Sequence, residues 1–467
     1  MKTTLRSWKI LLPLVAIVIA AFAVGTSAFA ARSAAVVRLA IMTDCKGAFA
    51  GGYELDIGGA QAALAQYAGG KPVDRKKPSA GMTGIKVGNT QVKIVGYGCG
   101  NDTVPVAATE TKRLMEQLKA DVMVGPLSGD EAVYVANYAK AHPTKTFIIG
   151  TAGSQDPTLQ IAPKNLFRYH GDGGQWNAGT GEIAYKTLKW RSAAIIMDDY
   201  SFAWGSSAGL IADFCGIGGK IVKRVFPPLN TTDYAPYIQQ LPAPDKVDGY
   251  FWVVGGTGTG PSLKAFQAAY GKLDPKKFVG NLFFFFQSGF ADVAPLLIGS
   301  YFGGFGTAPG LKTKQAKAYE AVIKKWYGPS GIPAGDGFTY NYYNAAWALV
   351  LGLEKSGGAV GAKLQAGLPR TLRTGYQVSN GGLVKLDSNR QAIADQYPLR
   401  IVKGADGKPT TAVVAYLPSV DQSFGGFFKK TSPPPGRTQP PCVRHKYPWT
   451  GKVRVVKNGV ITKQIIK

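Results

Sequence analysis

The chain has 467 residues, enough for two or three domains, and it carries a formal net charge of +26. That charge would suit nucleic acid or an anionic surface, but the basic residues are scattered, and the densest run is only Arg75-Lys76-Lys77. We therefore expect a basic surface on a secreted protein and no nucleic-acid site. No CxxC spacing is present and there are three histidines, so a metal centre is not expected either.

The first thirty residues have the pattern of an export signal. Three basic residues precede a mostly apolar run at residues 10–24, and Ala28-Phe29-Ala30 supplies the small residues that a signal peptidase requires. The apolar run is shorter than the ~20 residues of a spanning helix. We expect cleavage of residues 1–30 after Ala30 and a periplasmic or extracellular protein, with an uncleaved, tethered form as the alternative.

Early in the mature chain, strands alternate with helices. Strands are expected at Gln91–Tyr97, Asp121–Gly125 and Thr146–Gly150. The last two end in glycine-rich loops that carry Ser128 and Ser154. Because parallel sheets bind ligands at the carboxyl ends of their strands, this pattern predicts a hydroxyl-rich pocket. No catalytic group is evident there, so we expect binding without chemistry.

The same alternation resumes after a glycine-rich loop at Gly171–Gln175. A helix is expected at Ser206–Cys215, and four further strands are expected at Ala193–Met197, Lys220–Phe226, Val247–Val254 and Phe278–Phe286. Two arrays of similar size predict an α/β protein with two doubly wound parallel-sheet lobes, joined by crossovers and separated by a cleft.

The last third of the chain changes character. After two helices near 313–327 and 339–355, Gly382–Lys408 has the pattern of a hairpin that pairs LVKLD with YPLRIVKG. Residues 419–467 are expected to form a proline-rich tail with little secondary structure, followed by a terminal hairpin that turns at Asn458-Gly459.

Four cysteines in an exported chain predict two disulfides. Cys45 follows the first strand of the mature chain, and Cys99 follows Gln91–Tyr97. In a sheet of order 2-1-3 these strands are neighbours ~4.8 Å apart, within the ~4.4–6.8 Å Cα separation of a disulfide. Of the three possible connectivities, this geometry favours Cys45 with Cys99, and Cys215 would then tie a helix of the second lobe to Cys442 in the tail.

Six features in this order resemble the type I periplasmic solute-binding proteins of ABC importers, most closely the leucine/isoleucine/valine-binding family of branched-chain amino acids. The resemblance covers Val36 to Lys408. Its marks are the opening strand with the loop Asp44–Gly52, VGPLSG at Val124–Gly129, GSQDP at Gly153–Pro157, DDYSFAWG at Asp198–Gly205, the turn Gly255-Gly256 and the predicted hairpin at Gly382–Lys408.

The resemblance implies two lobes that close on a small polar solute and deliver it to the membrane permease of an ABC importer. It divides the chain into an N-terminal lobe, residues 36–172 with about 305–375, and a C-terminal lobe, residues 173–304 with about 376–408. It also implies a monomer that needs no cofactor and performs no catalysis. The expected solute is an amino acid or a related amide.

The resemblance also implies ligand contacts. The substrate carboxylate would meet hydroxyls and N–H groups in two loops of the N-terminal lobe, at Ser128, Gly129, Ser154 and Gln155. The carbonyl of Gly153 would accept from the substrate ammonium, Trp204 would cover the ligand, and Thr257 would line the second lobe. The family usually has a glutamate where this chain has Gln287 in LFFFFQSG. Amides, urea-like solutes and aromatic acids therefore stay open.

Two features of the sequence point to functions of other classes. Gly205–Gly209 fits G-x-S-x-G, which would indicate a secreted serine hydrolase, but the preceding strand ends about ten residues too early. The only downstream histidine is His445, in the tail. The second alternative is a ligand-binding sensory ectodomain that keeps its N-terminal anchor.

Overall fold

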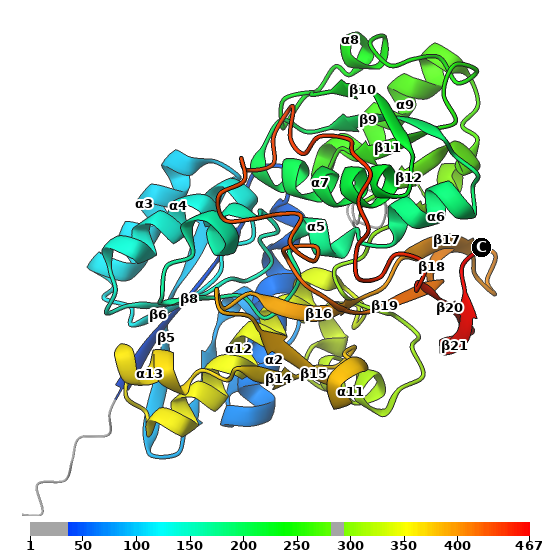
Figure 1. Cartoon of the computed structure of the whole chain (residues 1–467). Helices are drawn as coiled ribbons and strands as arrows, with labels where there is room; N and C mark the ends of the chain where they lie inside the picture. The colour runs from blue at the N-terminus through cyan, green and yellow to red at the C-terminus, as the bar shows by residue number, and fades with distance from the viewer. Residues whose placement is uncertain (1–35, 282–293) are drawn as a thin grey trace, which may run out of the picture. The chain divides into compact units, whose positions relative to one another are not determined.

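Six strands form the first sheet of the computed structural model, which describes residues 36–281 and 294–467 (Figure 1). The order is β4-β5-β1-β6-β7-β8, parallel except for β4 at the edge. The predicted 2-1-3 order is confirmed, because β1 lies between β5 and β6. The strands are β1 (Val36–Asp44), β4 (Lys86–Val87), β5 (Thr90–Gly100), β6 (Val122–Val124), β7 (Thr146–Ile148) and β8 (Leu166–Phe167).

Helices cover both faces of this sheet. Along β1, Leu39 and Ile41 pack on the side of α2 and α12, whereas Ala40 and Met42 pack on the side of α3 and α4. Burial on both faces explains why the strand is a nearly continuous apolar run. The helices are α2 (Tyr53–Ala68), α3 (Val104–Lys112), α4 (Gly129–Ala141), α11 (Lys314–Tyr327), α12 (Gly337–Ser356) and α13 (Ala362–Gly367).

The second sheet has the order β10-β9-β11-β12-β13-β17-β18. Its first five strands are parallel, β17 runs antiparallel to β13, and β18 runs antiparallel to β17. The strands are β9 (Ser192–Met197), β10 (Lys220–Val225), β11 (Gly249–Val253), β12 (Phe278–Gly280), β13 (Tyr301–Phe302), β17 (Leu399–Lys403) and β18 (Pro409–Val413). The helices that accompany this sheet are α5 (Gly173–Trp176), α6 (Thr180–Lys186), α7 (Ser201–Gly216), α8 (Ala235–Ile238) and α9 (Thr259–Tyr270).

The two doubly wound sheets confirm the predicted fold class. We call the first sheet with its helices the first lobe, and the second sheet with its helices the second lobe. Of the predicted strand Phe278–Phe286, the structure shows β12 at Phe278–Gly280, and Asn281 after it is not in a strand. Residues 282–286 and Gln287 lie outside the described residues, as does the predicted export signal.

A third, antiparallel sheet corrects the predicted hairpin. Its order is β14-β15-β16-β19-β20-β21, and β15 pairs with β16 instead of with β17. The turn between them closes early, because Arg390 adopts φ 65° and Asp387 accepts the N–H of Gln391. After Pro398, β17 joins the second sheet. The strands are β14 (Thr371–Arg373), β15 (Leu383–Leu386), β16 (Ala392–Gln396), β19 (Ala415–Val420), β20 (Arg454–Lys457) and β21 (Val460–Ile465).

The terminal hairpin is confirmed. β20 and β21 pair through a turn in which Asn458 and Gly459 have φ 49° and 74°. Two successive left-handed residues are what a two-residue hairpin turn requires.

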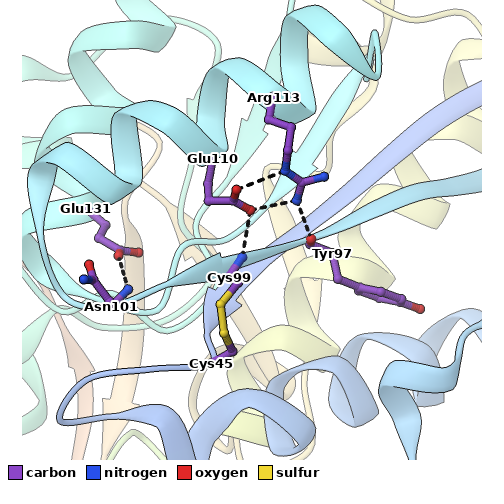
Figure 2. Close-up of a disulfide and its surroundings, with 7 residues drawn as sticks. All are labelled: Cys45, Tyr97, Cys99, Asn101, Glu110, Arg113 and Glu131. Carbon is purple, nitrogen blue, oxygen red and sulfur yellow. Dashed lines mark hydrogen bonds and ion pairs between the residues drawn. A yellow bond between two sulfur atoms is a disulfide. The ribbon is translucent and has the colours of Figure 1, made fainter.

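Both predicted disulfides are present. Cys45 bonds to Cys99 with their Cα atoms 5.0 Å apart, and Cys215 bonds to Cys442 at 5.2 Å. The first joins the ends of β1 and β5, as Figure 2 shows.

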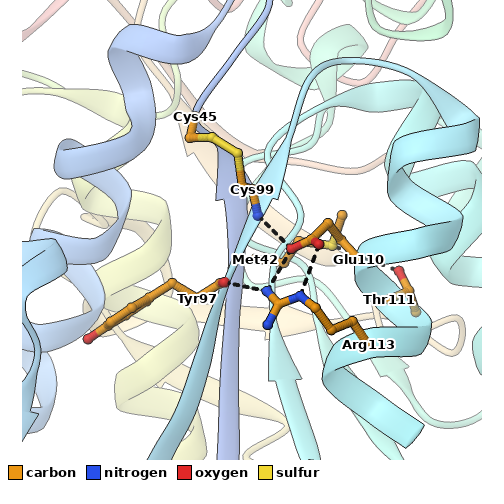
Figure 3. Close-up of polar contacts among 7 residues, drawn as sticks. All are labelled: Met42, Cys45, Tyr97, Cys99, Glu110, Thr111 and Arg113. Atoms are coloured by element: carbon orange, nitrogen blue, oxygen red, sulfur yellow. Dashed lines mark hydrogen bonds and ion pairs between the residues drawn. A yellow bond between two sulfur atoms is a disulfide. The ribbon is translucent and has the colours of Figure 1, made fainter. Parts of the chain in front are cut away.

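An ion pair holds the end of β5. Glu110 accepts the N–H of Cys99 (2.9 Å) and pairs with Arg113, which also donates to the carbonyl of Tyr97 (2.7 Å; Figure 3). These bonds fix the strand end that leads into the loop Asn101–Thr103. None of the helices in the described parts of the chain has the length and apolarity needed to cross a bilayer.

Candidate ligand-binding site

A small pocket lies where the strand ends of the two lobes meet. All of its residues but one follow β1, β6 and β7 of the first lobe or β9 and β13 of the second lobe, which places the pocket at the carboxyl ends of parallel strands. The exception is Phe338, in the first turn of α12. The hollow measures about 230 Å³, counted to its open mouth, and is lined by Phe49, Leu127, Ser128, Gly129, Thr151, Tyr200, Phe202, Phe305 and Phe338.

Aromatic rings dominate the lining: five of the nine lining residues are phenylalanine or tyrosine. The rings of Phe49 and Tyr200 stack between the lobes with centroids 6.0 Å apart. Phe305 packs against Phe338 with centroids 4.9 Å apart. An aromatic lining of this kind favours a flat or branched apolar ligand body.

The start of helix α4 supplies the polar side of the pocket. Ser128 has an extended backbone (φ −76°, ψ 147°) and precedes the first helical residue, Gly129. The Oγ of Ser128 is buried and lies close enough to the Asp102 carboxylate to lower the pKa of that group, although no strict hydrogen-bonding geometry is met among the described residues. The first N–H groups of a helix have no partners inside that helix. A buried hydroxyl therefore lies beside a helix N-terminus that favours negative charge.

The N-termini of α4 and α7 approach each other closely at this pocket. A Cβ added at Gly129 would lie 2.8 Å from the backbone N of Phe202, so only glycine allows this contact. The Asp130 carboxylate accepts the N–H of Ser201 over 3.1 Å. A residue of the first lobe thus provides the first hydrogen bond for a helix of the second lobe.

This cap explains why α7 begins at Ser201, five residues before the predicted start at Ser206. Trp204 consequently lies within the first turn of α7 and is not among the residues that line the pocket. Tyr200 and Phe202, from the same motif, line it instead. The motif DDYSFAWG thus contributes Tyr200 and Phe202 to the pocket, whereas the predicted contact of Trp204 with ligand stays a prediction.

The other predicted contacts lie at different depths. The loop at residues 149–156, which we call the β7 loop, contributes Thr151 to the lining. In the same loop, the carbonyl of Gly153 accepts the N–H of Gly173 (2.7 Å), and Ser154 Oγ donates to the carbonyl of Gly129 (3.0 Å). The remaining two predicted residues also lie outside the lining: Gln155 is buried and Thr257 is exposed.

The structure therefore brings Ser128 and Gly129 into the pocket and places Gly153, Ser154 and Gln155 in the loop behind it. Phe305 and Phe338 were missed by the sequence analysis. They come from segments remote in sequence, and no local pattern marks them as pocket residues.

A buried acidic cluster lies near Ser128. It consists of Asp44, Asp102 and Glu131, and Glu131 accepts the N–H of Asn101 over 3.1 Å (Figure 2). Burial raises the pKa of Asp102 to about 6 and of Glu131 to about 7, and it raises that of Asp44 well above its usual value. Repulsion between the carboxylates adds to the rise at Asp44 and Glu131.

None of the lining residues that the structure describes carries a charged side chain. Asp198, near Tyr200, is fully buried and accepts the N–H of Gly255 over 2.7 Å. Within the same described ranges, no cluster of histidine, cysteine and acidic side chains could hold a metal ion. Ser207 of the G-x-S-x-G motif lies inside α7 and not at a strand-to-helix turn, which argues against a hydrolase.

Two doubly wound lobes around a small pocket at their strand ends define a solute-binding protein. Residues 36–408 match the family model described as periplasmic binding protein, and the chain belongs to that family. Membership of that family makes it a solute-binding protein and not an enzyme. No curated protein matches the chain.

Solved structures of this class share the fold. A solute-binding protein from R. palustris in complex with benzoate is 19% identical, with a TM-score of 0.66, covering 82% of this chain and 99% of its own. A second, in complex with 4-hydroxybenzoate, is 18% identical, with a TM-score of 0.67 and coverage of 83% and 98%. A leucine-binding protein from Thermotoga maritima is 17% identical, with a TM-score of 0.61 and coverage of 82% and 99%.

Proposed function

We propose that the protein captures a small aromatic carboxylic acid outside the cytoplasm and delivers it to the permease of an ABC importer. The observation that carries this proposal is the lining of the pocket, where aromatic rings surround a polar end formed by Ser128 and the start of α4. Such a pocket matches a ligand with a ring at one end and a carboxylate at the other.

Neutral donors suffice for the carboxylate in this arrangement. The hydroxyl of Ser128 and the unpaired N–H groups at the start of α4 donate to the carboxylate, and the helix dipole adds favourable potential. The rings of Phe49, Tyr200 and Phe202 pack against the ligand ring. Two of the structural relatives described above hold aromatic acids of this size, benzoate and 4-hydroxybenzoate.

An α-amino acid, as the sequence resemblance implies, is the second candidate. Four carboxylates raise the pKa of Tyr200 beyond the effect of burial: Asp102, Asp198, Asp130 and Asp44. At a pH where these carboxyls are ionised, their negative potential would favour a ligand ammonium near that tyrosine. A leucine-binding protein is also among the structural relatives.

Closure supplies the signal for the permease. Phe49 and Tyr200 stack, and Asp130 caps α7, only where the lobes meet. A ligand that contacts both lobes binds the closed arrangement more tightly than the open one. The difference between the two affinities sets how far the ligand shifts the protein toward closure. A monomer is sufficient for this mechanism. If the N-terminal segment were retained, the same closure would serve a sensory ectodomain.

A thermal-shift panel on residues 31–467 tests the ligand class. The probes are benzoate, 4-hydroxybenzoate, leucine, valine, phenylalanine and benzamide. A ligand at about 100 times its Kd adds about 2.7 kcal/mol to the stability of the folded state. We expect the two benzoates to raise the melting temperature and benzamide to raise it less. A response to the amino acids alone would replace the aromatic-acid proposal with the second candidate.

A further inference from the structure

The C-terminal segment, residues 421–467, lies beyond the residues that the family model matches, yet it contacts the β7 loop. Gln422 is only 1% exposed. Its side-chain amide lies within hydrogen-bonding distance of the carbonyl of Gln155 (3.2 Å), Thr158 Oγ1 (2.9 Å) and Asp172 Oδ2 (2.7 Å). One side chain of the C-terminal segment therefore joins the end of the β7 loop to the crossover that follows β8.

The β7 loop is held from its other side by Arg168. This fully buried side chain donates to the carbonyls of Ala152 (2.9 Å) and Ser154 (2.8 Å), and its Nε donates to Gln391, the residue just before β16 (2.6 Å). Arg168 also bonds to Thr158, which Gln422 contacts as well. The loop thus lies in a buried polar network to which the C-terminal segment contributes.

The same segment is attached to the helix that lines the other side of the pocket. Cys442 is bonded to Cys215, near the end of α7, and Trp449 Nε1 donates to Asp213 over 3.1 Å. In Figure 1 the segment, coloured orange to red, passes along α7. Helix α7 carries the pocket residue Phe202 at its other end.

Aromatic packing strengthens this attachment. Phe424, Phe428 and Trp449 share one buried cluster with Ala208 and Ala212 of α7. The phenyl ring of Phe424 lies 4.8 Å from the ring of Trp449. The segment therefore has an apolar core of its own against α7, in addition to the disulfide.

We propose that the C-terminal segment positions the β7 loop against α7, with Gln422 as the positioning residue, and that it thereby holds both sides of the pocket in place before ligand arrives. One continuous segment contacts the loop through Gln422 and the helix through Cys442 and Trp449. Pre-organisation of this kind lowers the entropy lost on binding. The role in affinity rests on the proposed pocket, whereas the positioning itself is measurable without ligand.

Hydrogen exchange of the ligand-free protein, residues 31–467, tests the positioning directly. Gln422→Ala is expected to speed exchange in peptides that cover residues 149–161 by about tenfold, because the loop opens locally more often. Peptides from α2 and α12 keep wild-type rates, which a general loss of stability would not allow. Gln464→Ala is the matched control, since Gln464 is exposed on the same segment. Wild-type exchange of the β7 loop in a folded Gln422→Ala protein would overturn the proposal.

The double variant Cys215→Ser/Cys442→Ser keeps the proposal testable if Gln422→Ala does not fold. Detachment of the segment from α7 is expected to give the same faster exchange at residues 149–161 and a larger radius of gyration without ligand. With 4-hydroxybenzoate as the probe, its dissociation rate should rise by about tenfold while the association rate changes little. Unchanged exchange and an unchanged radius of gyration would overturn the proposal whether or not 4-hydroxybenzoate binds.

Discussion

The carboxylate of Asp130, at the start of α4, accepts the N–H of Ser201, at the start of α7, over 3.1 Å. The two residues belong to different lobes, so this bond exists only when the lobes are together. Closure of the lobes therefore also completes the hydrogen bonding at the start of α7, because this helix of the second lobe gains its cap from the first lobe.

Asp130→Ala should therefore weaken ligand binding. An N-cap bond is worth about 1 kcal/mol, which corresponds to about a fivefold rise in Kd. Titration calorimetry with the ligand found by the thermal-shift panel measures the change. Asp248→Ala is the control, because Asp248 accepts the N–H groups of Arg191 and Ser192 entirely within the second lobe. An unchanged Kd for Asp130→Ala would show that the bond does not contribute to closure.

Substitutions of Phe202 and Trp204 test whether ligand binds in the observed pocket or under Trp204, as the sequence resemblance implies. Phe202 lines the pocket and Trp204 does not. We expect Phe202→Ala to raise Kd by about tenfold or more, as loss of a central aromatic contact does. Trp204→Ala should change Kd by less than about threefold. The opposite ranking in fluorescence or calorimetric titrations would mean that Trp204 covers the ligand.

Ser128 is expected to donate to the ligand carboxylate. Ser128→Ala removes one hydrogen bond, worth about 1 kcal/mol, so Kd for benzoate should rise by about fivefold. Ser207→Ala is a matched control, because Ser207 is equally buried but lies inside α7. Equal effects of the two variants would count against a direct contact from Ser128.

Stability should fall as pH rises through neutrality. Burial raises the pKa of Asp102 to about 6 and of Glu131 to about 7, above the values expected in the unfolded chain. The folded protein therefore binds more protons than the unfolded chain between about pH 4 and pH 7, so the free energy of unfolding decreases over that range.

Urea denaturation at several pH values between 4.5 and 8 measures this decrease. A single raised carboxyl contributes a slope of at most about 1.4 kcal/mol per pH unit. Glu131→Gln, which is neutral at every pH, should reduce the slope. A Glu131→Gln protein with the wild-type slope would assign the pH dependence to other groups.

Much of the fold was predictable because its signals are local or follow from strand order. The apolar run of β1, buried on both faces, identifies a central parallel strand. The Cys45–Cys99 pair followed from the neighbouring positions of β1 and β5. The strand that pairs with β15 could not be predicted in this way, because several apolar runs of similar length could pair with β15. The left-handed backbone of Arg390 decides where the turn forms.

The site was predictable only as far as its loops. Ser128 and Gly129 could be located because they follow a strand and start a helix. The start of α7 depends on Asp130, a residue 71 positions earlier in the chain, so local pattern could not reveal it. The same is true of Phe305 and Phe338, which reach the pocket from segments outside both predicted βα arrays.

Titration calorimetry of residues 31–467 with 4-hydroxybenzoate and with leucine tests the central claim most directly. We expect saturable binding of one 4-hydroxybenzoate per chain, weakened by Phe202→Ala, and no measurable heat from leucine. Saturable binding of leucine without binding of 4-hydroxybenzoate would contradict the proposal of an aromatic-acid pocket.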